Sequence, residues 1–117
     1  MGRAYALALG AAGARVVVND FNGKAADAVV AEIIAAGGVA IADHHSVSSE
    51  GEQMVADVIS RFGRIDAVIN NAGILRDKSF IKMTDAEWDA VQATHLQGTY
   101  SVTKAAWPHM LKQKSGR

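Results

Sequence analysis

Cysteine is absent from the 117 residues, and there is a single proline. Without cysteine the chain has neither a disulfide framework nor a thiolate nucleophile, and small secreted domains usually depend on disulfides. Net charge is absent as well, because 12 Lys and Arg residues balance 12 Asp and Glu residues. Such a chain lacks the basic surface that a nucleic-acid backbone attracts. These absences predict an intracellular protein that does not bind nucleic acid.

Long hydrophobic runs are also missing, since a membrane-spanning helix needs about 18 apolar residues or more. The Ala- and Leu-rich start, residues 4–14, superficially resembles a signal peptide. It continues directly into the strand-like residues 15–18 with no loop for a peptidase to enter. Ala6 also stands where a myristoylation signal has Ser or Thr. We therefore expect neither secretion nor a membrane partner.

Half of the residues are hydrophobic, which is enough for the core of one domain. Periodicity predicts helices over residues 3–12, 24–36, 49–62 and 84–112, and short buried strands over residues 16–18, 39–42 and 67–69. Gly13, Gly37 and Gly63 stand where a left-handed residue would end the first three helices. The alternation predicts a doubly wound α/β fold with parallel strands and helices on both faces of the sheet. No linker divides the chain, so a single domain over residues 1–117 is expected.

Two of the helix starts carry capping signals. Ser49 and Glu52 have the spacing of a capping box, and so do Thr84 and Glu87. In a capping box each of the two side chains accepts a hydrogen bond from the backbone of the other residue. We therefore expect the third and fourth helices to begin at these positions.

Several short motifs stand at the element boundaries of this predicted fold. They are Gly2-Arg3-Ala4 before the first helix, Asp20 after the first strand, Asn70-Asn71-Ala72-Gly73 after the last strand, and Trp88 in the final helix. Together they resemble the short-chain dehydrogenase/reductase family, and the resemblance covers essentially the whole chain. The segments FGRIDAVINNAGILRDKSF and KAAWPHMLKQKSGR are more narrowly similar to the (3R)-hydroxyacyl-CoA dehydrogenase units of peroxisomal-type multifunctional enzymes and their bacterial relatives.

The resemblance implies that the chain begins inside the family's phosphate-binding turn. That turn follows the first strand of the family fold, and its glycines let the backbone approach a pyrophosphate at a helix N-terminus. Gly2 matches the last of those glycines, although a plain helix-start glycine is an open alternative. The expected fold is therefore a partial Rossmann-like fold that lacks the first strand and the C-terminal catalytic half.

The same resemblance assigns NAD as the cofactor of the intact parent. A carboxylate at Asp20 can accept both ribose hydroxyls of the adenosine half of NAD and would repel the 2′-phosphate of NADP. A solvated Asp in a strand-to-helix turn is the alternative. Asn71, Ala72 and Gly73 are the further cofactor candidates, because small residues admit a ribose. Asn70 is expected to brace the sheet instead.

His45 stands where the relatives usually present an Asp that holds the adenine amino group. The resemblance therefore assigns His45, with Ser46 after it, to the cofactor site. Asp43, His44 and His45 are also metal-ligand types in succession. Neighbouring residues of an extended segment point in opposite directions, and the sequence offers no evident third ligand. No metal site is predicted.

His95 is the one candidate catalytic residue, because most of the family has an Asn there that holds a water of the proton relay; a structural His is the alternative. Tyr100 and Lys104 have the Tyr-x-x-x-Lys spacing of the family's catalytic pair. They lie one helix and one strand too early, so we expect a packed Tyr100 and a Lys104 directed to solvent. The catalytic Ser and Tyr-Lys would follow Arg117, and the chain alone is predicted to be inactive.

Three hypotheses about function stay open. The chain is a fragment of an enzyme whose intact form oxidises a 3-hydroxyacyl-CoA or a similar secondary alcohol with NAD, or it is a non-catalytic module that binds adenosine or self-associates. A third possibility is that the gene continues past both ends, which genomic sequence upstream of Met1 and beyond Arg117 would decide. In the family's sheet order the missing first strand lies between the strands at Val16 and Val68. These two strands should therefore either pair directly with each other or be completed by a second copy of the chain in a homo-oligomer.

Overall fold

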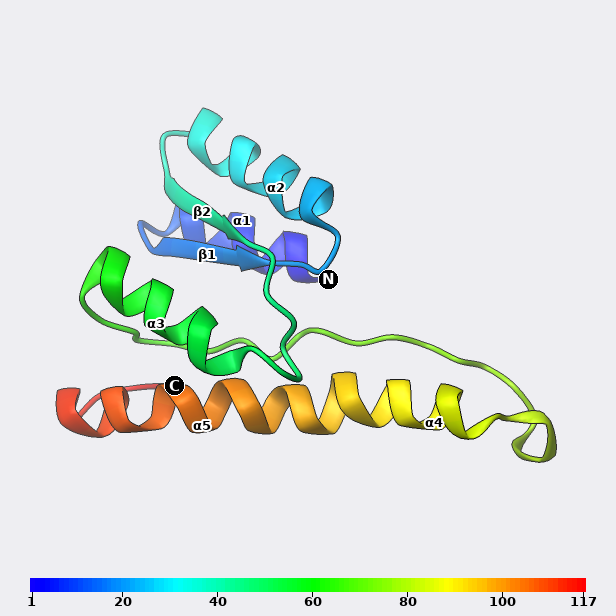
Figure 1. Ribbon diagram of the computed structural model, residues 1–117. Helices are drawn as coiled ribbons and strands as arrows, with labels where there is room; N and C mark the ends of the chain where they lie inside the picture. Colours follow the sequence, from blue (N-terminus) through cyan, green and yellow to red (C-terminus); the bar gives the residue numbers. More distant parts are fainter.

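The structure is a computed structural model that describes residues 1–117. The strands are β1 (Arg15–Asn19) and β2 (Val39–Asp43), and the helices are α1 (Gly2–Ala11), α2 (Gly23–Ala35), α3 (Gly51–Phe62), α4 (Asp85–Gln92) and α5 (Gly98–Gln113). Helices and strands alternate in the first part of the chain, and the two strands run parallel (Figure 1). The predicted α/β class is confirmed.

The sheet consists of β1 and β2 alone, with Val16 opposite Ala40. Side chains alternate between the two faces of a strand, so the even-numbered residues of β1 and β2 share one face of the sheet. That face packs against α1 and α2. We call the resulting cluster the N-terminal core; its buried members are Ala6, Val16, Val29, Ile33 and Ala40. Asn19 and Asp43 lie on the opposite face of the sheet by the same alternation.

A second cluster, the C-terminal core, forms between α3 and α5. Its buried members are Met54, Val55, Ile65, Val102 and Ala106. In Figure 1 α3 and the long helix formed by α4 and α5 lie on the side of the sheet away from α2. Helices therefore cover both faces of the sheet, as predicted. The Arg15 guanidinium lies 5.0 Å from the centre of the Phe62 ring, a cation–π contact that joins the start of β1 to the end of α3.

Most of the helix ends lie where the sequence predicts them. Gly13, Gly37 and Gly63 all have positive φ directly after α1, α2 and α3, as predicted. The capping box of α4 is confirmed, because Thr84 Oγ1 accepts from Glu87 N at 3.2 Å and Glu87 Oε2 accepts from Thr84 N at 3.0 Å. These ends depend on local backbone geometry, which explains why the sequence predicts them.

The expected capping box of α3 is wrong. The helix begins at Gly51, its N-cap is Glu50, and no side-chain cap bond forms there. Glu50 Oε2 accepts from Ser46 N at 2.7 Å, and Glu50 N donates to Ser46 O at 2.8 Å. Ser49 is thus held inside a closed turn that precedes the helix, where it cannot serve as the cap.

The capping contacts of Glu87 predict a pH-dependent stability. Hydrogen bonds from Lys78, then from the backbone and side chain of Thr84, lower the pKa of Glu87 from 4.5 to about 2. A carboxyl whose folded pKa is depressed stabilises the fold above its unfolded pKa, and this contribution is lost as pH falls through the folded value. Wild type should therefore exceed Glu87→Gln in stability at neutral pH, and the difference should shrink between about pH 4.5 and 2.

Urea unfolding followed by circular dichroism across that pH range measures this difference. Thr84→Ala is the companion variant, since loss of an N-cap costs about 1 kcal/mol. Because the Thr84 hydroxyl also donates to Glu87, its removal should raise the pKa of Glu87 as well. A difference between wild type and Glu87→Gln that stays constant down to about pH 2 would contradict the prediction.

The predicted strand over residues 67–69 does not form, and this expectation is wrong. A ladder needs a neighbouring strand about 4.8 Å away, and the backbone beside this segment is the C-terminal tail. Val68 N donates to Arg117 O at 2.9 Å, and Arg117 N donates to Asp66 O at 3.0 Å. Direct pairing of the strand at Val16 with Val68 is wrong as well, because β1 pairs only with β2. Completion of the sheet by a second copy stays a prediction.

The final helix is confirmed but is not uniform. A π-helical turn, Ala93–Gln97, joins α4 to α5, so the helical path runs from Asp85 to Gln113. None of the helices is long and apolar enough to cross a membrane.

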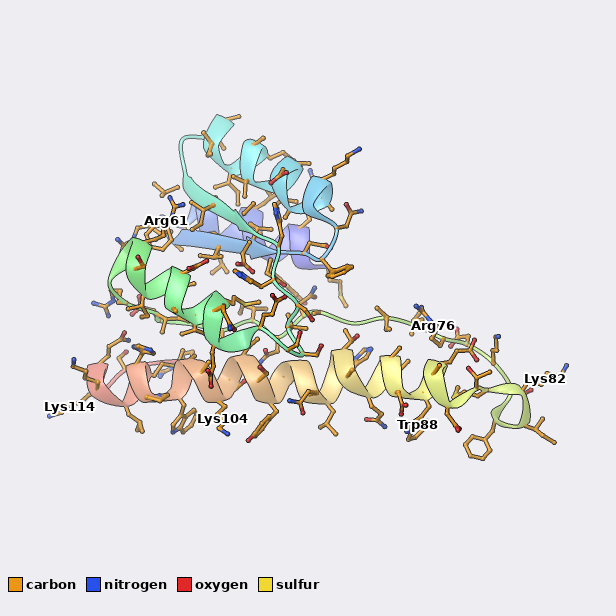
Figure 2. All side chains as sticks on the ribbon, viewed as in Figure 1. Arg61, Arg76, Lys82, Trp88, Lys104 and Lys114 are labelled. Carbon is orange, nitrogen blue, oxygen red and sulfur yellow. The ribbon has the colours of Figure 1, made fainter.

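The expectation of a packed Tyr100 is wrong. Its side chain is 54% exposed and its hydroxyl accepts a 2.9 Å hydrogen bond from Lys104 Nζ. Figure 2 shows Lys104 and Trp88 on the side of the long helix turned away from α3. The C-terminal core occupies the other side of the helix, so Tyr100 lies outside it.

Candidate functional site

The carboxyl ends of β1 and β2 meet at one edge of the sheet. Asp20 N donates to Asp43 O at 3.2 Å. Asn19 Nδ2 donates to Asp43 Oδ2 at 2.6 Å and to His45 O at 2.9 Å. Parallel α/β sheets bind ligands outside the carboxyl ends of their strands. The structure therefore brings the predicted residues Asp20 and His45 to the edge where a ligand would be expected.

Asp20 is exposed and held in a fixed orientation. Its Oδ1 accepts from Asn22 N at 2.8 Å, which closes a side-chain-to-backbone turn before α2. The second oxygen, Oδ2, has no hydrogen-bond partner in the protein. A carboxylate has about four lone-pair sites, so this one can still accept from two neighbouring hydroxyls.

Asp43 and His45 form a close pair behind this edge. The Asp43 side chain is 7% exposed, and its Oδ1 lies 2.6 Å from His45 Nδ1. Asp43 Oδ2 accepts from His45 N at 3.3 Å as well as from Asn19. The hydrogen bond to Asp43 raises the pKa of His45, with the charges of Asp43, Glu50 and Asp57 acting in the same direction and partial burial opposing them.

Asp57, on α3, is the residue that sequence analysis missed. One ligand atom each from Asp43, His45 and Asp57 lie within 4.8 Å of one another. The Asp57 carboxylate approaches across the face of the sheet opposite the N-terminal core, a relation that depends on how α3 packs. Both Asp43 oxygens and His45 Nδ1 already make hydrogen bonds within the protein, so Asp43 and His45 form a hydrogen-bonded pair with Asp57 beside it.

His44, adjacent to His45, faces a different element. Its Nε2 lies 3.2 Å from Asp27 Oδ1 on α2, and its ring borders Gly23 at the start of that helix. This confirms the expectation that the two histidines point apart, as side chains of neighbouring extended residues do.

Ser46 lies in the turn that leads to α3. Its Oγ is 3.1 Å from Ser48 Oγ, and its backbone N donates to Glu50. It follows His45 directly at the same edge of the sheet and is half-buried.

The segment after Val68 crosses between α1 and the long helix. A Cβ atom placed on Gly2 would lie 2.7 Å from Asn71 Nδ2, and one placed on Gly73 would lie 2.7 Å from His95 Cε1. His95 Nε2 is 3.1 Å from Ile74 N and 2.9 Å from Ile74 O. The four predicted residues Gly2, Asn71, Gly73 and His95 therefore form one continuous set of contacts.

Ala72 and Asn70 complete this segment. Ala72 is exposed and lies between Asn71 and Gly73. Asn70 Nδ2 donates to Thr103 Oγ1 at 3.0 Å, so the amide holds the segment to α5 and does not brace the sheet as expected. The absence of a strand over residues 67–69 removes the sheet edge that Asn70 was expected to brace.

Two groups of predicted residues thus lie near the carboxyl end of the β1–β2 pair. Because α1 leads directly into β1 in the opposite direction, the start of α1 lies at the carboxyl end of β1, as Figure 1 shows at the label N. The first group contains Asp20, His45 and Ser46, and the second contains Gly2 and the segment 71–73 with His95. The first offers hydrogen-bond acceptors and the second offers small residues and backbone N–H groups, a combination suited to a nucleotide.

Known proteins are similar to this chain over its whole length. The family model of the short chain dehydrogenases matches residues 1–117. The peroxisomal hydratase-dehydrogenase-epimerase of Saccharomyces cerevisiae is 51% identical over 126 aligned positions, which cover 100% of this chain and 14% of that protein. The peroxisomal multifunctional enzyme type 2 of Mus musculus is also 51% identical, over 100% of this chain and 17% of its own length.

Solved structures show the same fold. A metagenomic short-chain oxidoreductase in complex with NADP superposes with a TM-score of 0.91 at 36% identity, over 98% of this chain and 53% of that one. The chain thus spans about half the length of this structure and less than a fifth of the yeast and mouse relatives. With a family model that matches the whole of its length, the chain belongs to the short chain dehydrogenase family.

Proposed function

We propose that residues 1–117 form the adenosine-binding part of an NAD-dependent oxidoreductase. The observation that carries the proposal is the meeting of Asp20 and His45 at the carboxyl edge of the β1–β2 pair, with the start of α1 and Asn71 at the same end. When bound, NAD would accept a hydride from the substrate. The chain's own residues would hold the adenosine: Asp20 through the ribose hydroxyls and Gly2 through the backbone beside the pyrophosphate.

The proposed parent reaction is the oxidation of a 3-hydroxyacyl-CoA or a similar secondary alcohol. The similarity to the yeast and mouse enzymes supports it, and their names also support an intracellular, peroxisomal-type setting. His95 is the candidate for positioning a water of the proton relay, since its ring contacts Gly73 and the backbone of Ile74. The chain alone is proposed to bind cofactor without turning over substrate.

Asp20 is the residue that tests the proposal. Hydrogen bonds to a charged group contribute about 1.5–3 kcal/mol, so Asp20→Ala should weaken NADH binding by about 10–100-fold in a calorimetric titration. The exposed Asp89 on α4 offers a matched control, and Asp89→Asn should leave NADH binding unchanged. NADH binding that survives Asp20→Ala would remove the ribose role and with it the proposed site.

The same titration with NADPH tests the choice of cofactor. The similar metagenomic oxidoreductase was solved with NADP, whereas the Asp20 carboxylate here would repel a 2′-phosphate. We expect NADH to bind more tightly than NADPH in wild type, and we expect Asp20→Asn to reduce that preference because it removes the charge. Tighter binding of NADPH to wild type would overturn the assignment of NAD.

Self-association is the second candidate function, alone or together with cofactor binding. The outward side chains of the long helix leave a large apolar surface exposed; they are Trp88, Leu96, Tyr100, Trp107 and Leu111, each more than half exposed. Contiguous exposed apolar surface of this kind is typical of an interface. We propose a homo-oligomer that covers it. Light scattering should give a mass above that of the monomer, and Trp107→Lys should reduce it; a monomer mass at every concentration would exclude this candidate.

A further inference from the structure

Asn22 lies in the exposed turn that joins β1 to α2. It is the N-cap of α2, but its side chain makes no capping hydrogen bond. The hydrogen bonds of Asn22 run through its backbone: its N donates to Asp20 Oδ1 at 2.8 Å, and its O accepts from Ala25 N at 2.9 Å and from Ala26 N at 3.3 Å. The side-chain amide of Asn22 is therefore free to turn.

The backbone nitrogen of the next residue, Gly23, is free as well. Gly23 is the first residue of α2, and the first N–H groups of a helix have no carbonyl within the helix to donate to. Glycine also has no side chain that would crowd its own nitrogen. Gly23 N can thus approach the side chain of Asn22 without giving up a hydrogen bond of its own.

We infer that Asn22 is a site of spontaneous deamidation, at which the chain modifies itself. Gly23 N attacks Asn22 Cγ and loses its proton to water, and the bond from Cγ to Nδ2 breaks, so that the amide nitrogen leaves as ammonia. The product is a five-membered succinimide ring. Addition of water to either of the two ring carbonyls opens the ring and gives aspartate or isoaspartate at this position. Water is the only co-reactant, and nothing is oxidised or reduced.

The other asparagines lack this combination. Asn19 is followed by an aspartate, and its Nδ2 donates to Asp43 Oδ2 at 2.6 Å. Asn70 is followed by another asparagine, and its Nδ2 donates to Thr103 Oγ1 at 3.0 Å. Asn71 is followed by an alanine, whose methyl group crowds ring closure. Only Asn22 has both a free amide and a glycine after it.

The conversion adds a negative charge to the turn that holds Asp20. In the aspartyl product α2 should stay intact, because Asp is among the preferred N-cap residues. In the isoaspartyl product the main chain passes through Cβ, which displaces the carbonyl that accepts from Ala25 N and Ala26 N. Either product should repel a 2′-phosphate and so favour NADH over NADPH further. This consequence rests on the proposed function, whereas the conversion itself does not.

Mass spectrometry of the full chain tests the conversion. The protein is incubated in mildly alkaline buffer, which favours loss of the Gly23 proton, and is then digested with trypsin beside a fresh sample. Cleavage after Arg15 and Lys24 releases residues 16–24, a peptide that contains both Asn22 and its matched control Asn19. We expect Asn22 to convert while Asn19 stays an amide. An unconverted Asn22, under conditions in which the isolated peptide converts, would overturn the inference.

Gly23→Ala tests the attack by the backbone nitrogen. The added Cβ would lie 3.3 Å from the nearest atoms of the His44 ring, whose side chain is 52% exposed and can move aside. We expect Asn22 to convert more slowly by about tenfold or more, because the methyl group crowds ring closure. An unchanged rate would indicate direct hydrolysis of the amide and would overturn the succinimide route.

Asn22→Asp carries the added charge from the outset and tests the consequence for the cofactor. In calorimetric titrations the ratio of the NADPH to the NADH dissociation constant should rise by about threefold over wild type. An unchanged ratio with both dinucleotides bound would overturn this consequence alone. No binding of either dinucleotide would overturn the proposed function, and the mass-spectrometric result for Asn22 would stand.

Discussion

Replacing Ile33 by alanine is expected to destabilise the chain by about 2–5 kcal/mol. Ile33 is 2% exposed and is the largest fully buried side chain. It joins α2 to the rest of the N-terminal core, and its Cγ2 fills the space beside Gly10 and Gly38, where an added Cβ would come within 2.8 and 2.7 Å of it. Truncation leaves a cavity among three backbone segments that cannot easily collapse.

This loss is large relative to the whole, because small domains are stable by only about 5–15 kcal/mol. Urea denaturation monitored by circular dichroism measures it. Ile33→Val is the matched control, which removes one methyl group and should cost about 0.5–1.5 kcal/mol. A cost for Ile33→Ala no larger than that of the valine variant would show that the N-terminal core contributes little to stability.

Gly51→Ala is expected to produce the second large effect, a loss of about 1–3 kcal/mol. A Cβ atom on Gly51 would collide with Ser101 Oγ and would lie 2.9 Å from Ser101 C and 3.0 Å from Val102 N. The last two atoms belong to the backbone of α5, which cannot rotate away as a side chain can. The methyl group would therefore separate α3 from α5 and open the C-terminal core.

The control for this prediction is the double variant Gly51→Ala with Ser101→Ala. It removes the hydroxyl but leaves both backbone atoms in place, so we expect it to recover only a small part of the lost stability. Full recovery would mean that the side chain alone limits the approach of the helices. Thermal and urea unfolding of the single and double variants decide between these outcomes.

The two substitutions together test the prediction of a single domain. Ile33 and Gly51 belong to different clusters, the N-terminal core and the helix pair around the C-terminal core. If residues 1–117 unfold as one unit, both variants should shift the same single transition. Two separate transitions, each sensitive to one variant, would show that the clusters unfold independently.

Local features of the fold could be predicted from the sequence because they depend on residues close in the chain. The glycines after α1, α2 and α3 adopt positive φ because a residue without a Cβ does so at little steric cost. The Thr84 to Glu87 box forms within one helical turn. The parallel pair β1 and β2 follows from two β-branched or apolar runs separated by a helix.

The positions of the predicted site residues could be inferred where they depend on the ends of elements. Asp20 and His45 follow adjacent parallel strands, so their approach at one edge was implied by the order of elements. The contacts of Gly2 with Asn71 and of Gly73 with His95 join residues that the family resemblance had selected one by one. Their assigned roles in binding and catalysis stay predictions, and the Asp20 variants address the first of these roles.

What the sequence by itself determined is therefore the set of helices, the parallel strand pair and the family motifs at their ends, all of which are encoded in short-range patterns. Only the tertiary structure decided that residues 67–69 stay outside a ladder, that Asn70 bonds to Thr103, and that Asp57 approaches His45. The physical reason is the same in each case: a hydrogen bond or a charge contact needs a partner brought from elsewhere in the chain, and packing determines which partner arrives.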